Sequence, residues 1–458
     1  PKADRIHRIV VNETSPEGNV TKFGSTGMMP GPAFKRQVPE IENFVRVSGT
    51  QFNIKKGVDV LTQEAMKVDS SFFSIFSFEF LEGSPKTALK DPNSVVVSEE
   101  VAERFFGSTH VVGKTLSIGY DGGFNNFTVS AVTKKSPQNS SIKIALLMPI
   151  HRDKQQDDQW INFYLNTFVL LAPNADVKKV EANFARIFAS EAKQQLIEAK
   201  EKWNYKHTID YKLQPLLAMH LSTDYRADNG LRGDSNPMYS YILTGIAVFI
   251  LLIACINFVN LTVARSLKRA KEIGIRKVVG GDRRQLIGQF LGESFLLSFL
   301  AFLFAIALVQ LSLPVFNTLA NKALALSYLL DWSLVLGYIG LFLVTGFLAG
   351  FYPALVLSGF SPVATLYGRF SFSGGTWLQK SLVVFQFTLA TFLIVGTLIL
   401  YAQFEYLTTR DLGYNDRNVV SFNTGRIDHL KAQTFRNELL KNPEITHAAP
   451  RHNGMWFT

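Results

Sequence analysis

Residues 265–294 read RSLKRAKEIGIRKVVGGDRRQLIGQFLGES, and this stretch lies between two long apolar runs. Glu272 and Asp282 are its acidic residues before the second run begins. The basic residues are Arg265, Lys268, Arg269, Lys271, Arg276, Lys277, Arg283 and Arg284. A short basic loop between two membrane-spanning helices is typical of the cytoplasmic side. The stretch therefore predicts a multi-pass membrane protein and indicates which way it faces.

The same stretch has helical order. Ile273, Arg276, Lys277 and Gly280 are spaced so that the polar and apolar faces of a helix separate. The glycine pair 280–281 ends that helix, and the aspartate after it is a suitable N-cap for the next one. We expect a short amphipathic helix at the cytoplasmic surface, joined rigidly to a membrane helix on each side. This helix either transmits motion from a cytoplasmic partner to the membrane helices or anchors the chain on anionic lipid.

Composition supports a membrane protein over a nucleic-acid binder. The 458 residues carry a formal net charge of +10, and much of this excess lies in the loop described above. The one cysteine, Cys255, excludes a disulfide within the chain. The sequence opens with PKADRIHRIVV and shows no signal peptide. We expect both ends to be truncated.

Residues 1–237 predict a soluble α+β domain, with residues 91–150 as an inserted subdomain. Helical patterns cover 99–106, after Ser98 as an N-cap, and 177–202. Residues 224–237 are polar and link this domain to the membrane. The predicted strands are Arg5–Val11, Asn43–Ser48, Val58–Val68, Ser94–Ser98, Phe127–Val132, Tyr164–Ala172 and Thr208–Leu217. Interleaved strands and helices predict mixed sheets packed against helices.

Four apolar runs are each long enough to cross a bilayer core of about 30 Å. They are residues 238–264, 286–313, 333–356 and 381–403. The first three form an all-α membrane domain, 238–356, with 265–285 as its cytoplasmic coupling segment, and 357–380 is a cytoplasmic linker. The charge bias places residues 1–237 outside and the basic loop inside. This topology requires a further membrane helix before Pro1.

Small and polar residues within the spans indicate packing between helices. Asn257 and Asn260 are expected to bond to a neighbouring helix, and Gly346 with Gly350 permits close contact. Glu293 either pairs with the basic loop or anchors at the interface. The spans carry no ladder of acidic or histidine residues, which argues against a proton- or ion-coupled carrier.

The sequence predicts no catalytic, cofactor-binding or metal-binding residues. Residues 107–115 resemble a phosphate-binding loop but have five residues between the glycines instead of four. Zinc motifs and a GxSxG elbow are absent. Asp157 and Asp158 are interpreted as solvated surface. The phenylalanines at 72, 73, 76 and 78 are interpreted as core in preference to a binding face.

The residues so far resemble the MacB/FtsX-type ABC transporter permeases. The membrane-domain signature is EIGIRK (272–277), followed by Gly280, Gly281, Gln289, Phe290, Glu293 and Ser294. Residues 68–89, 94–107 and 112–116 resemble the MacB-like periplasmic core domain, and 3–9 resemble the segment after a first membrane helix. Residues 378–403 resemble the opening of a second repeat, with 404–458 as the truncated start of a second periplasmic domain. This implies a fragment of a two-repeat, eight-span form.

The resemblance implies a non-catalytic membrane subunit. A separate MacB/LolD-type ATP-binding subunit would hold ATP and magnesium and dock on the coupling segment, while this chain would hold no cofactor. Further implied partners are a second permease half, membrane lipid and a periplasmic adaptor or hydrolase, with no nucleic acid. Glu272, Arg276 and Lys277 would make polar contacts at the dock, and Ile273 and Ile275 apolar ones. Lys271, Gly274, Gly280, Arg283 and Arg284 complete the implied docking set.

The implied location is the bacterial inner membrane, with a large periplasmic domain. The implied function is export or extrusion of an antimicrobial peptide, a drug or a lipoprotein. An FtsX-like signalling protein that regulates an external cell-wall hydrolase stays open as the alternative. A membrane-anchored receptor that needs no ATP is a third interpretation.

Overall fold

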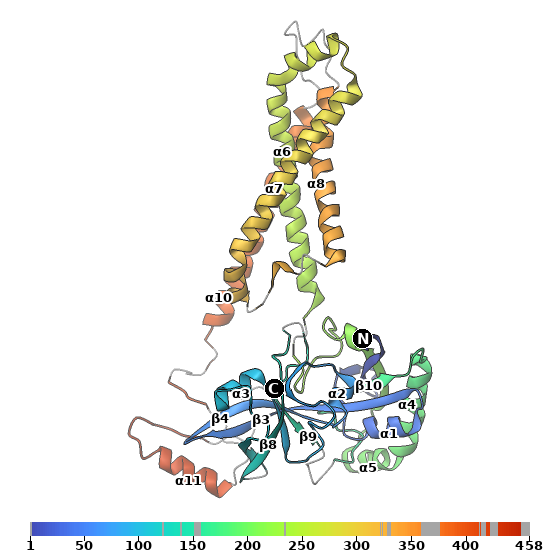
Figure 1. Ribbon diagram of the computed structural model, residues 1–458, viewed down its shortest axis with the longest axis vertical. Helices are drawn as coiled ribbons and strands as arrows, with labels where there is room; N and C mark the ends of the chain where they lie inside the picture. Colours follow the sequence, from blue (N-terminus) through green and yellow to red (C-terminus); the bar gives the residue numbers. More distant parts are fainter. Residues whose placement is uncertain are drawn as a thin grey trace.

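The computed structural model describes residues 2–120, 123–137, 140–150, 157–232, 235–320, 322, 324–327, 331–358, 376–411, 413, 418–421 and 429–449. Figure 1 shows a domain built on a sheet, with long helices extending from one side of it. These two parts are the mixed α/β domain and the helical domain that the sequence predicts.

The strands of the first part form one sheet. They are β1 (Ile6–Thr14), β2 (Val20–Phe23), β3 (Ile41–Lys56), β4 (Asp59–Val68), β5 (Phe80–Gly83), β6 (Ser94–Ser98), β7 (Thr115–Tyr120), β8 (Gly123–Thr133), β9 (Leu146–Pro149), β10 (Asn166–Leu171) and β11 (Thr208–Pro215). The main order is β11-β1-β10-β3-β4-β9-β6-β8-β5, while β2 pairs with β1, and β7 pairs with β3 and β8. The pairs β4–β9 and β6–β8 are parallel. Every predicted strand overlaps an observed one.

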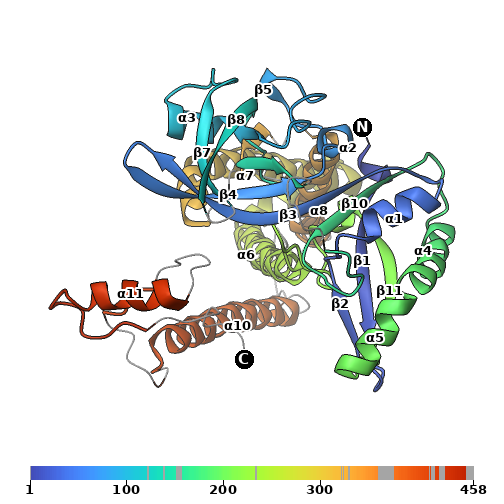
Figure 2. The ribbon, with the colours of Figure 1, turned by 90° about the horizontal axis from the view of Figure 1, so that it is seen from below.

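Helices pack at both ends of the sheet, and α2 contacts β3 between them (Figure 2). They are α1 (Pro30–Gln37), α2 (Phe72–Ile75), α3 (Glu99–Phe106), α4 (Val177–Glu191) and α5 (Lys193–Trp203), with short 3-10 turns η1 (Ala3–Arg5) and η3 (Leu216–Ala218). Figure 2 shows α1, α4 and α5 beside β1, β10 and β11, and α3 at the other end. Ser98 caps α3 as predicted, since its hydroxyl accepts from the Val101 N–H. The predicted helix 177–202 is divided at Ala192, whose side chain is buried in the core.

Residues 91–150 supply β6 to β9, which continue the same sheet. Their buried side chains share a core with Phe52 and Ile54 of β3. In the structure these strands belong to the same sheet as the others. The sheet alone therefore does not mark the segment off as a subdomain, and that interpretation stays a prediction.

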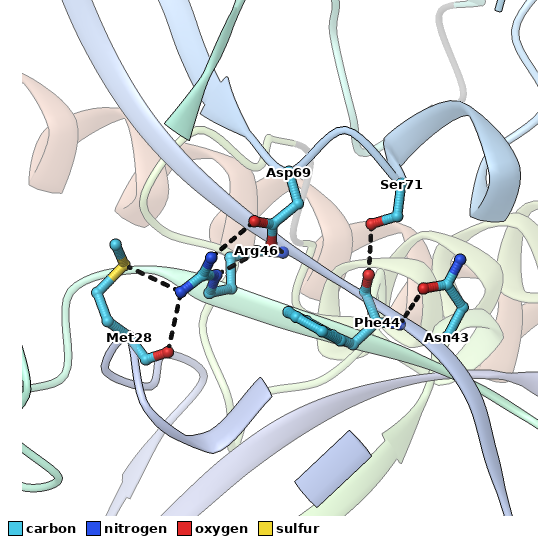
Figure 3. A network of polar contacts seen from close by, with 6 residues as sticks. All are labelled: Met28, Asn43, Phe44, Arg46, Asp69 and Ser71. Atoms are coloured by element: carbon cyan, nitrogen blue, oxygen red, sulfur yellow. Dashed lines mark hydrogen bonds and ion pairs between the residues drawn. The ribbon is translucent and has the colours of Figure 1, made fainter. Parts of the chain in front are cut away.

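The predicted phenylalanine core is confirmed. Phe72 and Phe76 are buried, and Phe73 and Phe78 pack against the same cluster. A buried ion pair fixes the turn that carries them (Figure 3): the Arg46 guanidinium donates to both carboxylate oxygens of Asp69, at 2.7 and 3.0 Å. Since Asp69 directly follows β4, this pair sets where the chain turns into α2.

Four helices are long and apolar enough to cross a membrane. They are α6 (Pro237–Val278), α7 (Arg283–Ala320), α8 (Trp332–Ser358) and α10 (Thr376–Thr409), with candidate spans at Pro237–Ala264, Arg283–Ala320, Trp332–Leu355 and Lys380–Thr409. Helix α8 packs against both α6 and α7, and α10 packs against α6. A further helix, α11 (His429–Leu439), lies in the C-terminal part. Most of the predicted linker 357–380, and much of 404–458, lie outside the described residues.

The first membrane helix continues into the predicted amphipathic helix. The sequence indicated a short amphipathic helix joined rigidly to the first span, and in the structure the two are one helix, α6, which runs without a break from Pro237 to Val278. The physical reason is that residues 265–278 contain no proline, and Gly274 alone costs a helix only about 1 kcal/mol. The coupling segment is therefore the end of the same rod that leaves the sheet domain.

Candidate coupling site

The turn between α6 and α7 is closed by hydrogen bonds to the last carbonyl groups of α6. The Gly281 N–H donates to Arg276 O at 2.8 Å, and the Gly280 N–H donates to Lys277 O at 3.2 Å. Gly280 has a φ of +100°, the left-handed conformation that this type of helix end needs. Asp282 directly precedes α7, in the N-cap position. The glycine pair thus ends α6 as the sequence predicts.

An apolar cluster joins three helices at this turn. Ile273 of α6 is buried against Leu286 and Phe290 of α7 and against Ala354 of α8. Its side chain therefore faces the chain's own helices and does not offer the apolar contact to a partner that the sequence implied. The sequence could not separate these two uses, because both need an apolar residue on one helix face.

Polar side chains follow the surface beside this cluster. Arg276 pairs with Glu272 at 2.7 Å and donates to Gln289 Oε1 at 2.8 Å. Gln289 in turn donates to Glu293 Oε1 at 3.1 Å. Both ends of the Arg276–Glu272 pair are about half exposed, so the pair adds little to stability. Arg276 and Glu272 remain accessible to a partner.

Lys277 and Arg283 hold the end of α8. The Lys277 ammonium donates to Ser358 O at 2.6 Å, and Arg283 Nε donates to Ser358 Oγ at 3.3 Å. Partial burial, together with the nearby charge of Arg283, lowers the pKa of Lys277. These two residues, which the sequence assigned to docking, also tie the turn to α8.

The outward face of the turn is apolar at its centre. Ile275, Val278 and Val279 are exposed, Val279 by 82%. Arg284 is also exposed, Gly274 is buried, and the side chain of Lys271 lies outside those described. The sequence interpretation did not single out the two valines. They could have been identified from the sequence, because they are two adjacent apolar residues in an otherwise charged stretch.

Two glycines of α8 lie against α7. A Cβ at Gly346 would come within 2.6 Å of the Phe295 ring, and one at Gly350 within 2.7 Å of Ser294 Cβ. This is the close helix contact that the spacing predicts. Asn257 is exposed, and the buried Asn260 Oδ1 has no hydrogen-bond partner among the described residues. The predicted asparagine bonds to a neighbouring helix stay a prediction.

The other end of α6 is joined to the sheet through a fully buried arginine. Arg8 of β1 donates to the carbonyl oxygens of Tyr225 and Arg226, at 2.9 and 3.0 Å. It also donates to Gln214 Oε1 of β11 at 2.7 Å and to Asn166 Oδ1 of β10 at 3.4 Å. One guanidinium thus holds the segment that leads to α6 against three strands.

The rest of this segment is fixed in the same way. Asn166 Nδ2 donates to Asp228 O at 2.8 Å, and the Gly49 N–H of β3 donates to Asn229 O at 2.9 Å. Gly230, with a φ of +93°, touches Gly49 so closely that a Cβ on either residue would overlap the other's backbone. We call residues 225–232 the joint. The sequence interpretation took them for a polar linker.

Helix α6 begins almost directly after the joint. Asn236 caps it, since its side chain accepts from the Met238 N–H at 2.9 Å, and Pro237 occupies the first helical position. Only a few residues therefore separate the clamped segment from the rod that ends at the α6–α7 turn.

The near phosphate-binding loop is occupied by a carboxylate of the chain itself. Glu82 Oε2 accepts from the N–H groups of Val111 and Val112, at 2.9 and 3.1 Å. Backbone donors that would bind a phosphate are thus already bonded. Within the part of the chain that the structure describes, no group of three or more His, Cys, Asp or Glu residues could hold a metal ion.

Comparison with known proteins divides the chain into two regions. Residues 3–187 match the MacB-like periplasmic core domain, and residues 244–362 match the FtsX-like permease C-terminal domain. A crystal structure of the periplasmic region of MacB from Actinobacillus actinomycetemcomitans is 10% identical, with a TM-score of 0.31, and covers 47% of this chain and 91% of that chain.

Two relatives are named as exporters. The pyoverdine export ATP-binding/permease protein PvdT of Pseudomonas syringae pv. tomato is 24% identical over 324 residues, which are 68% of this chain and 43% of the relative. The macrolide export ATP-binding/permease protein MacB of Bdellovibrio bacteriovorus is 34% identical over 96 residues, 21% of this chain and 13% of the relative. The chain thus spans less than half the length of either relative.

Proposed function

The chain belongs to the MacB/FtsX-like ABC transporter permeases and is a multi-pass inner-membrane protein with a periplasmic domain, and from this premise we propose that it is the subunit that carries ATP-driven motion across the membrane. A separate ATP-binding subunit of the MacB/LolD type would dock on the α6–α7 turn. ATP and magnesium would be held on that partner, and this chain would be non-catalytic. The periplasmic domain would move in response.

One observation carries this proposal: α6 is an unbroken helix of 42 residues between the joint and the α6–α7 turn. At a rise of 1.5 Å per residue it is about 63 Å long. A rod fixed at both ends passes a displacement at one end to the other, whereas a hinge within it would absorb that displacement.

The exposed face of the α6–α7 turn suits a docking role. Ile275, Val278 and Val279 present exposed apolar side chains, and the same turn carries the exposed Arg276 and Arg284. An apolar helix face laid into a groove, with charges around it, is a recurring way for one protein to hold another. The buried Ile273 would set the position of this face without touching the partner.

The names of the relatives suggest export as the outcome. We propose that this chain serves extrusion of an antimicrobial peptide, an amphiphilic drug or a lipoprotein from the periplasmic side, together with a second permease half and membrane lipid. A periplasmic adaptor is a further proposed partner.

The test is co-purification of the full chain with its ATP-binding partner, followed by measurement of the ATPase rate in lipid. The double variant Arg276→Glu/Lys277→Glu is expected to lose both association and stimulation of the ATPase. Because Lys277 also holds α8, Val279→Asp is the cleaner variant and is expected to give the same loss. Reversal of Lys55 and Lys56, at the tip of the β3–β4 hairpin, is the charge-matched control. Normal coupling in Val279→Asp and in the double variant would refute the docking assignment.

A further inference from the structure

Aromatic side chains mark where the membrane surface lies on the periplasmic side. Tyr239 and Tyr241 are exposed in the first turns of α6, Trp332 is exposed at the start of α8, and Tyr406 is exposed near the end of α10. Figure 1 shows these helix ends on the side of the bundle that faces the sheet domain. Tyrosine and tryptophan concentrate at the level of the lipid headgroups. The membrane surface therefore lies just above the joint.

A short turn of the sheet domain lies at this level. It comprises η3 and the residues up to Ser222, and we call it the η3 turn. His220 O accepts a hydrogen bond from the Ser235 N–H at 2.8 Å, and Ser235 is two residues before Pro237, the first residue of α6. In Figure 1 the light-green η3 turn lies beside the mark for the N-terminus, on the face toward the helices.

The η3 turn has two apolar faces. Leu216 and Met219 point inward, since Met219 is buried and Leu216 packs against the core. Leu217 is 68% exposed and Leu221 is 51% exposed. A single exposed leucine needs no explanation. These two leucines lie close to the start of a membrane helix, at the level of the lipid headgroups, and lipid is the apolar surrounding that could cover them.

We propose that the η3 turn inserts Leu217 and Leu221 into the periplasmic surface of the bilayer. The occupant of this surface is the boundary between headgroups and acyl chains, which apolar side chains reach to a depth of roughly 5–10 Å. The argument is one of continuity, because the His220–Ser235 bond holds the η3 turn beside the point where α6 enters the same lipid. The inference rests on α6 being a membrane span and does not depend on an ATPase partner.

Such a contact gives the sheet domain a point of support on the membrane in addition to α6. Without it, the domain would be freer to rotate about the start of that helix. With the η3 turn in the headgroup layer as well, a tilt of α6 must lift or press the η3 turn against lipid. The contact would thus define the resting orientation of the domain.

The experiment uses the full chain in nanodiscs, with Cys255→Ser as a common background. Leu217→Cys and Leu221→Cys are labelled with an environment-sensitive fluorophore, and quencher lipids carry a nitroxide either near the headgroup or near the bilayer centre. Val58→Cys is the matched control, since Val58 is an apolar residue 99% exposed at the β3–β4 hairpin tip. We expect blue-shifted emission and loss of intensity at 217 and 221, more with the shallow quencher, and neither effect at 58.

Two results would overturn the proposal. Emission at 217 and 221 equal to that at 58 would mean that the η3 turn is in water. Blue-shifted emission without quenching by either lipid would mean that protein covers it instead. A further variant tests whether the apolar side chain at 221 is needed for insertion. It carries the label at position 217 together with Leu221→Asp, and the lipid quenching of the label should be reduced. Unchanged quenching in that variant would also count against the η3 turn as the inserting element.

Discussion

Replacing Arg8 by methionine should release the joint while leaving most of the sheet folded. Methionine keeps the apolar stem but removes the donors to Tyr225 O, Arg226 O, Asn166 Oδ1 and Gln214 Oε1. A hydrogen bond from a charged donor is worth about 1.5–3 kcal/mol. Part of that loss is offset because the variant no longer buries a cation. The expected net loss from the two bonds to the joint is therefore about 2–4 kcal/mol.

This loss should appear as faster hydrogen exchange at amides that depend on the joint. The reporters are the N–H groups of Gly49, Arg232 and Ser235, which donate to Asn229 O, Ser141 O and His220 O. If the joint opens locally, 2–4 kcal/mol should accelerate their exchange by roughly 30- to 1,000-fold. The assay is exchange followed by mass spectrometry on the full chain in nanodiscs.

A second buried arginine supplies the control. Arg46→Met breaks the pair with Asp69 and should accelerate exchange around Phe72, whose N–H donates to Asp69 O, but not in residues 229–235. Equal acceleration across the whole domain in Arg8→Met would show general destabilisation, and no change at the reporters would show that Arg8 does not hold the joint. Either result would refute the reasoning.

Two further predictions concern glycines of the helical part, both measured as thermal stability of the full chain in one detergent. Gly346→Leu should lower the melting temperature because its Cβ would overlap the Phe295 ring, whereas Gly340→Leu, also in α8 but with open space around it, should not. Gly280→Ala should be destabilising by about 1 kcal/mol, since φ is +100° there. Gly288→Ala, in an open position of α7, should instead stabilise by about 0.5–1 kcal/mol.

The sequence predicted those parts of the structure that depend on local pattern. Apolar runs predicted the four spans, and the glycine pair 280–281 predicted the end of α6. Short strands were missed where the pattern is brief: β9 has four residues, all buried, and takes its place through parallel pairing with β4. Such a run cannot be told from any other apolar segment until its partner is known.

The joint could not be predicted because its contacts are distant in sequence. Arg8 lies more than 200 residues before the carbonyl groups that it holds, and a polar segment rich in aspartate and glycine normally indicates a linker. An arginine at a buried position of a strand was an unusual feature, since charged residues are almost never fully buried without partners. That feature indicated a partner but not which one.

Transmission of motion along α6 requires both an unbroken helix and a fixed attachment of that helix to the sheet domain through the joint. A tilt of about 5° in a rod about 63 Å long displaces its far end by about 5 Å, roughly one helical turn. If residues 225–232 were a mobile linker, that displacement would be absorbed before it reached the sheet. Because Arg8 of β1 and Asn166 of β10 bind the joint, the proposed tilt would be passed on to the sheet. In the proposed function, motion at the α6–α7 turn would thus reach the periplasmic side through α6.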